Sequence, residues 1–262
     1  MIRSLYTAAS GMLANQMTVD TISNNLANVN TTGYKKTKME FQDLLYQTMV
    51  EPGGSTSEGV KLPGSLQVGL GVKPSGSNRS FEQGTITSTG NPWDVAITGN
   101  GFFQMRMPDG TLSYTRDGSF KTNADGVVVN AQGNYLDPQI QVPPNSSNPI
   151  VSADGRVTVT LQGQSEPTEI GKIELSSFVN PVGLRALGQN LYQESEASGK
   201  PLSGSPGENG TGSLANQYLE ASNVQMVEEM VNLIVAQRAY EISSKGITTA
   251  DQMLQTANNL RG

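Results

Sequence analysis

The chain has 262 residues, a formal net charge of −6 and neither cysteine nor histidine. Without these two residue types it cannot contain disulfides, thiolate nucleophiles, histidine-based triads or zinc sites built from thiolate and imidazole. The acidic net charge argues against a nucleic-acid partner. No apolar run reaches the roughly 18 residues of a membrane span, so we expect no membrane-spanning segment. The N-terminal stretch also lacks the continuous apolar segment and cleavage site of a secretory signal peptide.

The first 29 residues have the periodicity of a long amphipathic helix. Alternating steps of four and three residues from Met1 to Val29 reach an apolar side chain at eight of nine positions, which is a heptad pattern. The pattern then runs into the asparagine-rich stretch NNLANVNTTGYKK, residues 24–36. We interpret this stretch as the end of the helix, with Gly33 in the left-handed position that follows a helix and two lysines complementing the helix dipole.

Two glycine- and proline-rich tracts, residues 51–78 and 195–212, predict extended connectors. The segment between them is typical of a β domain, because short apolar runs alternate with Asp-Gly pairs that favour hairpin turns. These pairs are Asp109-Gly110, Asp117-Gly118, Asp125-Gly126 and Asp154-Gly155. The predicted order is therefore helix, connector, β body, connector, helix.

The C-terminal segment predicts a second long helix. Ser222 and Gln225 have the spacing of a capping box, and large residues then recur every seven positions, with small residues at a second set of heptad positions. The large residues are Met226, Leu233, Tyr240, Ile247 and Leu254, and the small ones are Ala236, Ser243, Ala250 and Ala257. A seam of alternating large and small residues can receive the side chains of another helix.

Three patterns that resemble chemical sites are weak. The segment from Gly99 to Phe102 begins like a dinucleotide loop but lacks the third glycine and a following helix. Residues 121–132 resemble a calcium loop without the carboxylates at its first and last positions. The carboxylates of the β body show no acid/base clustering, and Lys35, Lys36 and Lys38 are interpreted as a solvated helix end. We therefore predict no catalytic, cofactor-binding or metal-binding residue.

The apolar stripes of the two helices have two interpretations. They can face the core of one globular domain, or they can pair with each other and leave apolar surface for other copies of the chain. Their position at the two ends of the chain, beyond the connectors, favours the second interpretation. The predicted assembly interface consists of Leu5, Met12, Asn15, Val19, Ile22, Leu26, Val29, Met226, Leu233, Tyr240, Ile247, Ala250, Leu254 and Ala257.

Four segments resemble the signatures of the bacterial flagellar rod and hook proteins. They are SGMLANQMTVDTISNNLANVNTTGYKK, DVAITGNGFFQM, YTRDGSF and SNVQMVEEMVNLIVAQRAYEISSKGITTADQML, in the order found in that family. The length of the chain and the absence of a long additional outer domain make it most similar to distal rod members. A proximal rod or hook subunit is the alternative within the family, and a secreted enzyme acting on cell-wall glycan is the alternative outside it.

The resemblance implies an α+β fold with three parts. Residues 1–33 and 216–262 would form an inner coiled coil, residues 34–71 an extended linking region, and residues 72–215 a mainly antiparallel β outer domain. The tract from Tyr46 to Gly71 would separate a straight rod from a bendable hook. The asparagines of the helix end would bond to helix ends and neighbouring subunits. These asparagines are Asn24, Asn25, Asn28 and Asn30.

The resemblance also implies a function without cofactors. The chain would be a structural subunit of the flagellar basal body that assembles with itself into a helical rod and transmits torque through the periplasm to the hook. Its other partners would be the proximal rod proteins, the hook protein, the P-ring and L-ring proteins, and the flagellar type III export apparatus. That apparatus would export the chain without cleaving its N-terminus.

Overall fold

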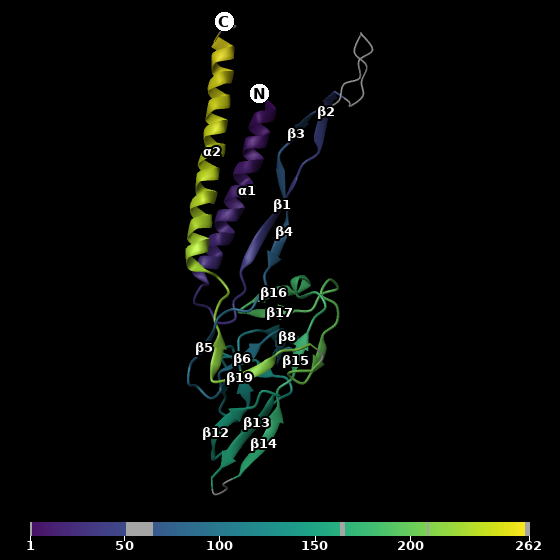
Figure 1. The fold of residues 1–262 in the computed structure, drawn as a ribbon, viewed down its shortest axis with the longest axis vertical. Coiled ribbons are helices and arrows are strands. Elements are labelled where there is room, and N and C mark those ends of the chain that lie inside the picture. The colour runs from purple at the N-terminus through teal and green to yellow at the C-terminus, as the bar shows by residue number, and fades with distance from the viewer. Residues whose placement is uncertain (1, 51–64, 163–165, 209, 260–262) are drawn as a thin grey trace. The chain divides into compact units, whose positions relative to one another are not determined.

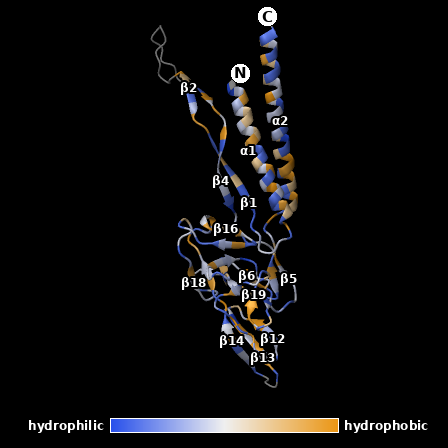
Figure 2. Cartoon of the chain, turned by 180° about the vertical axis from the view of Figure 1, so that it is seen from behind, coloured by the Kyte–Doolittle hydropathy of each residue, from blue (hydrophilic) through white to orange (hydrophobic). Residues whose placement is uncertain are grey.

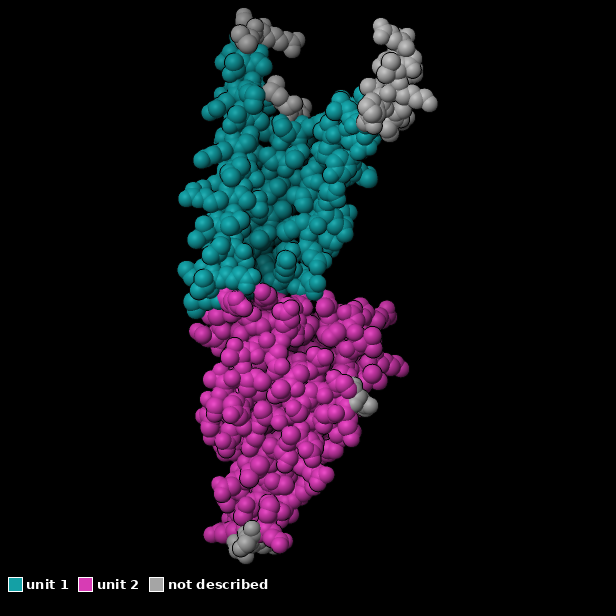
Figure 3. Space-filling view, viewed as in Figure 1, with its two compact units in different colours: residues 1–26, 37–78, 226–262 teal, residues 27–36, 79–225 magenta. Residues whose placement is uncertain are grey.

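The computed structural model describes residues 2–50, 65–162, 166–208 and 210–259. The chain forms two compact units, each built from discontinuous segments (Figure 3). The helical unit contains residues 1–26, 37–78 and 226–262, and the β unit contains residues 27–36 and 79–225. Two terminal helices and many antiparallel strands make the fold α+β, as the sequence predicts.

The helical unit consists of two long helices and two narrow β ribbons (Figure 1). Helix α1 spans Ile2–Ala27 and helix α2 spans Met226–Asn259, so both predicted terminal helices are confirmed. The ribbons pair β1 (Thr37–Asp43) with β4 (Val72–Arg79) and β2 (Tyr46–Val50) with β3 (Leu66–Gly69). Within the first predicted connector, residues 51–64 lie outside the described residues, and the remainder contributes strands instead of an unpaired chain.

Helix α1 ends earlier than the heptad pattern predicts. Val29 lies in the turn after the helix, where the Thr31 amide donates to the carbonyl of Asn28 at 3.1 Å and the Thr31 hydroxyl donates to the Asn28 side-chain oxygen at 3.1 Å. Such local bonds compete with the helical ones, which explains the early end. Gly33 has a φ of +67°, but it lies well beyond the last helical residue, so its predicted position next to the helix is wrong.

The β unit contains sixteen strands among the described residues, and each of them pairs antiparallel with at least one other. In chain order they are β5 (Ile86–Ser88), β6 (Val95–Thr98), β7 (Phe102–Arg106), β8 (Leu112–Thr115), β9 (Lys121–Thr122), β10 (Val128–Val129), β11 (Tyr135–Leu136), β12 (Ser146–Val151), β13 (Arg156–Leu161), β14 (Pro167–Lys172), β15 (Leu175–Ser177), β16 (Arg185–Gly188), β17 (Leu191–Gln193), β18 (Leu202–Gly204), β19 (Ser213–Asn216) and β20 (Tyr218–Glu220). One short 3-10 helix, Pro181–Gly183, precedes β16.

The largest sheet of the β unit has the order β16-β17-β8-β7-β11-β10-β9, and β15 joins it by pairing with β7 and β18. A three-stranded sheet has the order β12-β13-β14. Two further pairs join β19 to β6 and β20 to β5. Because β19 and β20 come from the segment just before α2, the β unit is completed only near the end of the chain.

Three of the four predicted Asp-Gly hairpins are confirmed. The turns at Gly110, Gly126 and Gly155 join β7 to β8, β9 to β10 and β12 to β13, and their φ values are 83°, 76° and 88°. The prediction for Gly118 is wrong, because β8 and β9 are not neighbours in the sheet. An added Cβ on Gly118 would overlap the carbonyl of Val95. The absence of a side chain at this glycine therefore lets the two backbones approach closely.

The second predicted connector is also wrong in part. Residues 202–204 form β18, which pairs with β15 along its whole length. The hydroxyl groups of Ser176 and Ser203 lie 3.0 Å apart across this pair. A glycine- and serine-rich composition therefore does not keep this tract away from the sheet.

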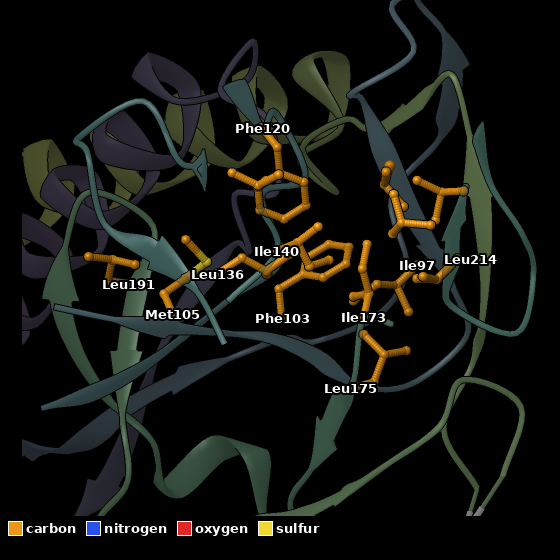
Figure 4. Close-up of a cluster of buried hydrophobic side chains, with 14 residues drawn as sticks. Ile97, Phe103, Met105, Phe120, Leu136, Ile140, Ile173, Leu175, Leu191 and Leu214 are labelled. Carbon is orange, nitrogen blue, oxygen red and sulfur yellow. The ribbon is translucent and has the colours of Figure 1, made fainter. Parts of the chain in front are cut away.

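The β unit encloses one main apolar core and a smaller aromatic cluster. Figure 4 shows the main core, in which the rings of Phe103 and Phe120 meet edge to face with centroids 5.0 Å apart. In the smaller cluster, Tyr114 and Phe178 meet edge to face at 4.8 Å. Fully buried aromatic side chains of this kind contribute much of the stabilisation of a domain.

Candidate functional site: two faces of the terminal helices

Helices α1 and α2 lie side by side and run in opposite directions (Figures 1 and 2). Three residue pairs fix their register. The side-chain amide nitrogen of Asn25 donates to a carboxylate oxygen of Glu229 at 3.3 Å. A Cβ on Gly11 would lie 3.6 Å from the Ser243 hydroxyl, and one on Gly246 would lie 3.9 Å from the Cβ of Ala8. Each step forward along α1 is matched by an equal step backward along α2, so the pairing is antiparallel and unbroken.

Small residues line the face of α2 that meets α1. Ala236 and Ala250 are 5% and 4% exposed, and Ser243, which lies against Gly11, is half-buried. These are residues of the predicted seam of small side chains. Small side chains let two helices approach closely, so this inner face explains why the seam alternates between large and small residues.

The structure of one chain already covers most of the predicted interface residues. Ile22 and Ala250 are buried. Those that are half-buried are Leu5, Met12, Asn15, Val19, Leu26, Leu233, Ile247 and Leu254, together with Val29 in the turn of the β unit. Met226, Tyr240 and Ala257 are exposed. The inner faces therefore belong first to the pairing of α1 with α2, and contacts of these residues with other subunits stay a prediction.

Asn25 joins three elements of the helical unit. Its side-chain amide donates to the carbonyl of Thr37 at 2.8 Å, and its oxygen accepts from the Thr37 amide at 3.0 Å. The third bond is the one to Glu229 in the first turn of α2, where a carboxylate also complements the positive end of the helix dipole. The expectation that this asparagine bonds to other subunits is wrong, because its partners belong to its own chain.

A second apolar surface, which we call the outer stripe, lies on α2. It consists of Val227, Val231, Ile234, Val235 and Ile242, whose exposed fractions lie between 54% and 76%. At 3.6 residues per turn these residues lie roughly 80–180° around α2 from the face marked by Ala236 and Ala250, so they extend from its flank to its far side. Figure 2 shows hydrophobic residues gathered toward the N-terminal half of α2. Contiguous exposed aliphatic side chains of this kind mark an interaction surface.

The ribbon of β2 and β3 adds exposed apolar residues to the helical unit. Leu45, Tyr46, Met49 and Leu66 are all more than half exposed. A two-stranded ribbon is marginally stable by itself in water, because it can bury little apolar surface. The ribbon, like the outer stripe, therefore has the character of a surface that another molecule covers.

Comparison with known proteins gives these surfaces a context. Residues 5–35 match the family described as flagella basal body rod protein, residues 96–159 match the flagellar hook protein FlgE/F/G D1 domain, and residues 215–260 match the flagellar basal body rod FlgEFG protein C-terminal family. The flagellar basal-body rod protein FlgG of Borreliella burgdorferi is 50% identical over 263 residues, which cover 100% of this chain and 99% of that protein.

The chain belongs to the flagellar basal-body rod protein family. The proteins of the same name from Caulobacter vibrioides and Bacillus subtilis are 48% and 37% identical, and each alignment spans 99% or more of both chains. Like the family, the protein is a structural component of the flagellar basal body and not an enzyme. Neither of its helices, within the residues described, has an apolar stretch long enough to cross a bilayer.

The matches to the rod family coincide with the helical elements. The segment 5–35 covers most of α1 and the turn after it, and the segment 215–260 runs from β19 through α2. The outer stripe and the inner face of α2 both lie within the second segment. The heptad pattern predicts the inner face but does not include the residues of the outer stripe. A count of apolar residues at steps of three and four from Val227 would have found it.

Proposed function

We propose that the protein assembles with copies of itself into the distal rod, a helical shaft that transmits torque through the periplasm to the hook. The outer stripe of α2 carries this proposal. It exposes five large aliphatic side chains outside the face of α2 that pairs with α1. Burial of such a stripe against another subunit would contribute roughly 1.5–3 kcal/mol per side chain.

In this assembly the paired terminal helices form an inner coiled coil with those of neighbouring subunits, and the β unit lies outside. Residues 1–33 with 216–262, 34–71 and 72–215 act as the coiled-coil core, the linking region and the outer domain. The proximal rod, the hook, and the P-ring and L-ring proteins are its neighbours. Export proceeds through the flagellar type III apparatus without cleavage of a signal peptide, and the assembled rod reaches the outer membrane. The family membership supports these partners.

Self-assembly is tested by comparing the purified protein with a stripe variant. Val231→Thr together with Val235→Thr keeps the shape of both side chains and replaces one methyl group of each by a polar hydroxyl. We expect the wild type to form tubes visible by electron microscopy on concentration, and the variant to stay monomeric in sedimentation with unchanged unfolding. Val179→Thr, at an exposed valine of the β unit, is the matched control and should still form tubes. Tubes from the stripe variant, or none from the wild type, contradict the proposal.

The shape of the tubes distinguishes the distal rod from a hook subunit. A distal rod protein should give straight tubes and a hook protein curved ones. We expect the tract from Tyr46 to Gly71 to determine this stiffness, because the exposed apolar ribbon of β2 and β3 offers a surface for neighbouring subunits. Deletion of residues 47–63 should therefore leave assembly possible but allow curvature. Tubes of the deletion variant as straight as those of the parent contradict this role.

A further inference from the structure

A fully buried ionic cluster in the β unit joins segments that are far apart in the sequence. The ammonium of Lys35 lies 2.6 Å from a carboxylate oxygen of Glu220, and both side chains are 0% exposed. The guanidinium of Arg116 approaches the other oxygen of Glu220 at 3.4 Å. The Gly84 amide donates to the same carboxylate at 2.9 Å. One carboxylate thus pairs with two buried cations, and its removal would leave both without this ion-pair partner.

Lys35 was expected to be a solvated lysine at a helix end, and that expectation is wrong. Its ammonium also donates to the carbonyl of Glu82 at 2.6 Å, so it is held by two chain segments. Burial lowers the pKa of Lys35 from its ordinary value, while the charge of Glu220 opposes this shift. A buried lysine with two strong acceptors is a fixed structural partner, not a mobile surface charge.

Backbone contacts extend the cluster along the same segments. The Gly33 amide donates to the Glu220 carbonyl at 2.8 Å. Gly33 has a positive φ, and a Cβ there would lie 2.7 Å from the amide nitrogen of Asp117. Only glycine therefore fits at this position. Nearby, Asn223 accepts from the Lys36 amide at 2.7 Å and donates to the Ser80 carbonyl at 2.9 Å.

These residues stand at the points where the chain enters and leaves the β unit. The chain passes between the two units after residues 26, 36, 78 and 225. At three of these crossings the adjoining residues of the β unit are fixed by the contacts above: Lys36 before one crossing, Ser80 after another and Asn223 before the last. Residues next to three of the crossings are therefore held by the same set of contacts around the buried ionic cluster in the β unit.

We propose that Lys35, Arg116, Glu220 and Asn223 form a clamp, which holds together the β-unit residues next to the chain crossings. Torque would then be transmitted through segments that are fixed to one another, and not through independent flexible strands. The torque in this proposal rests on the proposed function as a rod subunit. The clamp itself is a property of the single chain. The two can therefore be tested separately.

The clamp is tested on the full-length monomer with trypsin. Between Arg3 and Lys35 the sequence has no lysine or arginine, so cleavage after Lys35 or Lys36 reports directly on the clamped segment. Glu220→Gln removes the charge of the carboxylate and keeps its shape. Because breaking a buried ion pair strongly favours local opening, we expect cleavage after Lys36 to accelerate about a hundredfold. The fluorescence of Trp93, which packs against the main core, should stay native.

Two further variants keep the test decisive. Lys35→Met removes the ammonium and leaves Glu220 paired with Arg116 alone, so it should fold even if Glu220→Gln does not, and it should also expose Lys36. Val157→Ala weakens the main core, where Val157 is fully buried, without touching the clamp. It should lower the denaturation midpoint of the β unit, measured by Trp93 fluorescence. Under native conditions it should not promote cleavage after Lys36. Unchanged cleavage in both clamp variants, or cleavage that only follows loss of the Trp93 signal, overturns the clamp.

The torque role is tested in flagellated cells in which each variant replaces the rod protein. We expect Glu220→Gln cells to assemble rods and swim in dilute medium, but to lose motility in viscous medium, where the torque on the shaft is greater. Val157→Ala cells should lose less motility in viscous medium than Glu220→Gln cells. Equal swimming of both variants in viscous medium contradicts the torque role. Failure of the wild-type protein to form tubes in vitro would contradict the proposed function but leave the tryptic result unaffected.

Discussion

Tyr114 buries an ionisable hydroxyl in the aromatic cluster of the β unit. It is 1% exposed and packs edge to face on Phe178. Burial, with smaller contributions from the carboxylates of Glu194 and Asp137, raises the pKa of Tyr114 to about 12. An unfolded tyrosine titrates near pH 10, so the folded state holds this proton more tightly. The corresponding stability is complete below about pH 10 and is lost as the pH rises through about 12.

Tyr114→Phe should therefore reduce the sensitivity of the fold to alkali. Between pH 8 and pH 11 we expect the wild type to lose about 1 kcal/mol more unfolding free energy than the variant. The free energy is measured by denaturant titration, with Trp93 as the probe of the β unit. Tyr135→Phe, at an exposed tyrosine, is the control and should behave like the wild type. Equal losses in the wild type and Tyr114→Phe would refute the role of Tyr114.

Buried polar residues are where prediction from the sequence fails. Lys35 was predicted to be solvated because lysines after a helix usually are, and nothing local distinguishes it from Lys36 or Lys38. Its partner Glu220 lies 185 residues away, so the pair exists only once the sheets bring both segments together. The prediction for Asn25 fails for a similar reason, since its bond to Glu229 spans 204 residues. Local propensity carries no information about such pairs.

At the scale of the element, periodicity predicted both helices, and turn chemistry predicted three hairpins. Periodicity could not separate the two faces of α2. Its first half is apolar on several sides, because Val227, Met230 and Val231 fall between the heptad positions Met226 and Leu233, and Ile234 follows Leu233. A heptad count started from Met226 therefore follows the inner face and passes over the outer stripe. The burial of Ala236 and Ala250, with the contacts of Ser243 and Gly246, shows which face meets α1.

The inner face of α2 should tolerate no added volume. Ala250 is 4% exposed, so Ala250→Leu should overpack the helix pair at a cost of about 1–3 kcal/mol. We expect weakened polymerisation in sedimentation assays while secretion of the chain continues. Ala257→Leu makes the same change at an exposed position of the same helix and should not overpack the pair of α1 and α2. Leu254→Asp, which places a charge at a half-buried position, should act like Ala250→Leu, and normal rods from either variant contradict this prediction.

At the scale of the whole molecule, the two units differ in how they are stabilised. The β unit has a closed main core of fourteen buried apolar residues and the ionic clamp. The helical unit leaves the outer stripe and the β2–β3 ribbon exposed. Ordering the backbone costs about 1–2 kcal/mol per residue, and narrow helical stripes offset little of that cost without a partner. The β unit should therefore be the more stable part of an isolated chain.

In dilute solution we expect a broad-specificity protease to trim residues 1–26 and 226–262 first and to leave the β unit intact. Residues 27–36 should remain bound to residues 79–225 even after cleavage of the segment between them, because Gly33, Lys35 and Lys36 are bonded within the β unit. Mass spectrometry of the purified, nicked protein would detect this retained peptide.

Polymerisation should reverse the sensitivity of the ends. When neighbouring subunits cover the outer stripe, the helices gain the burial that offsets their ordering entropy, so folding and assembly are coupled. Helical circular dichroism should rise on polymerisation while the β signal stays constant, and residues 226–262 should become resistant to the same protease. Such coupling also restrains premature polymerisation, because a nucleus has to order many residues at once. A monomer whose helices resist protease as well as its β unit does would contradict this prediction and favour a single globular domain with both stripes in its core.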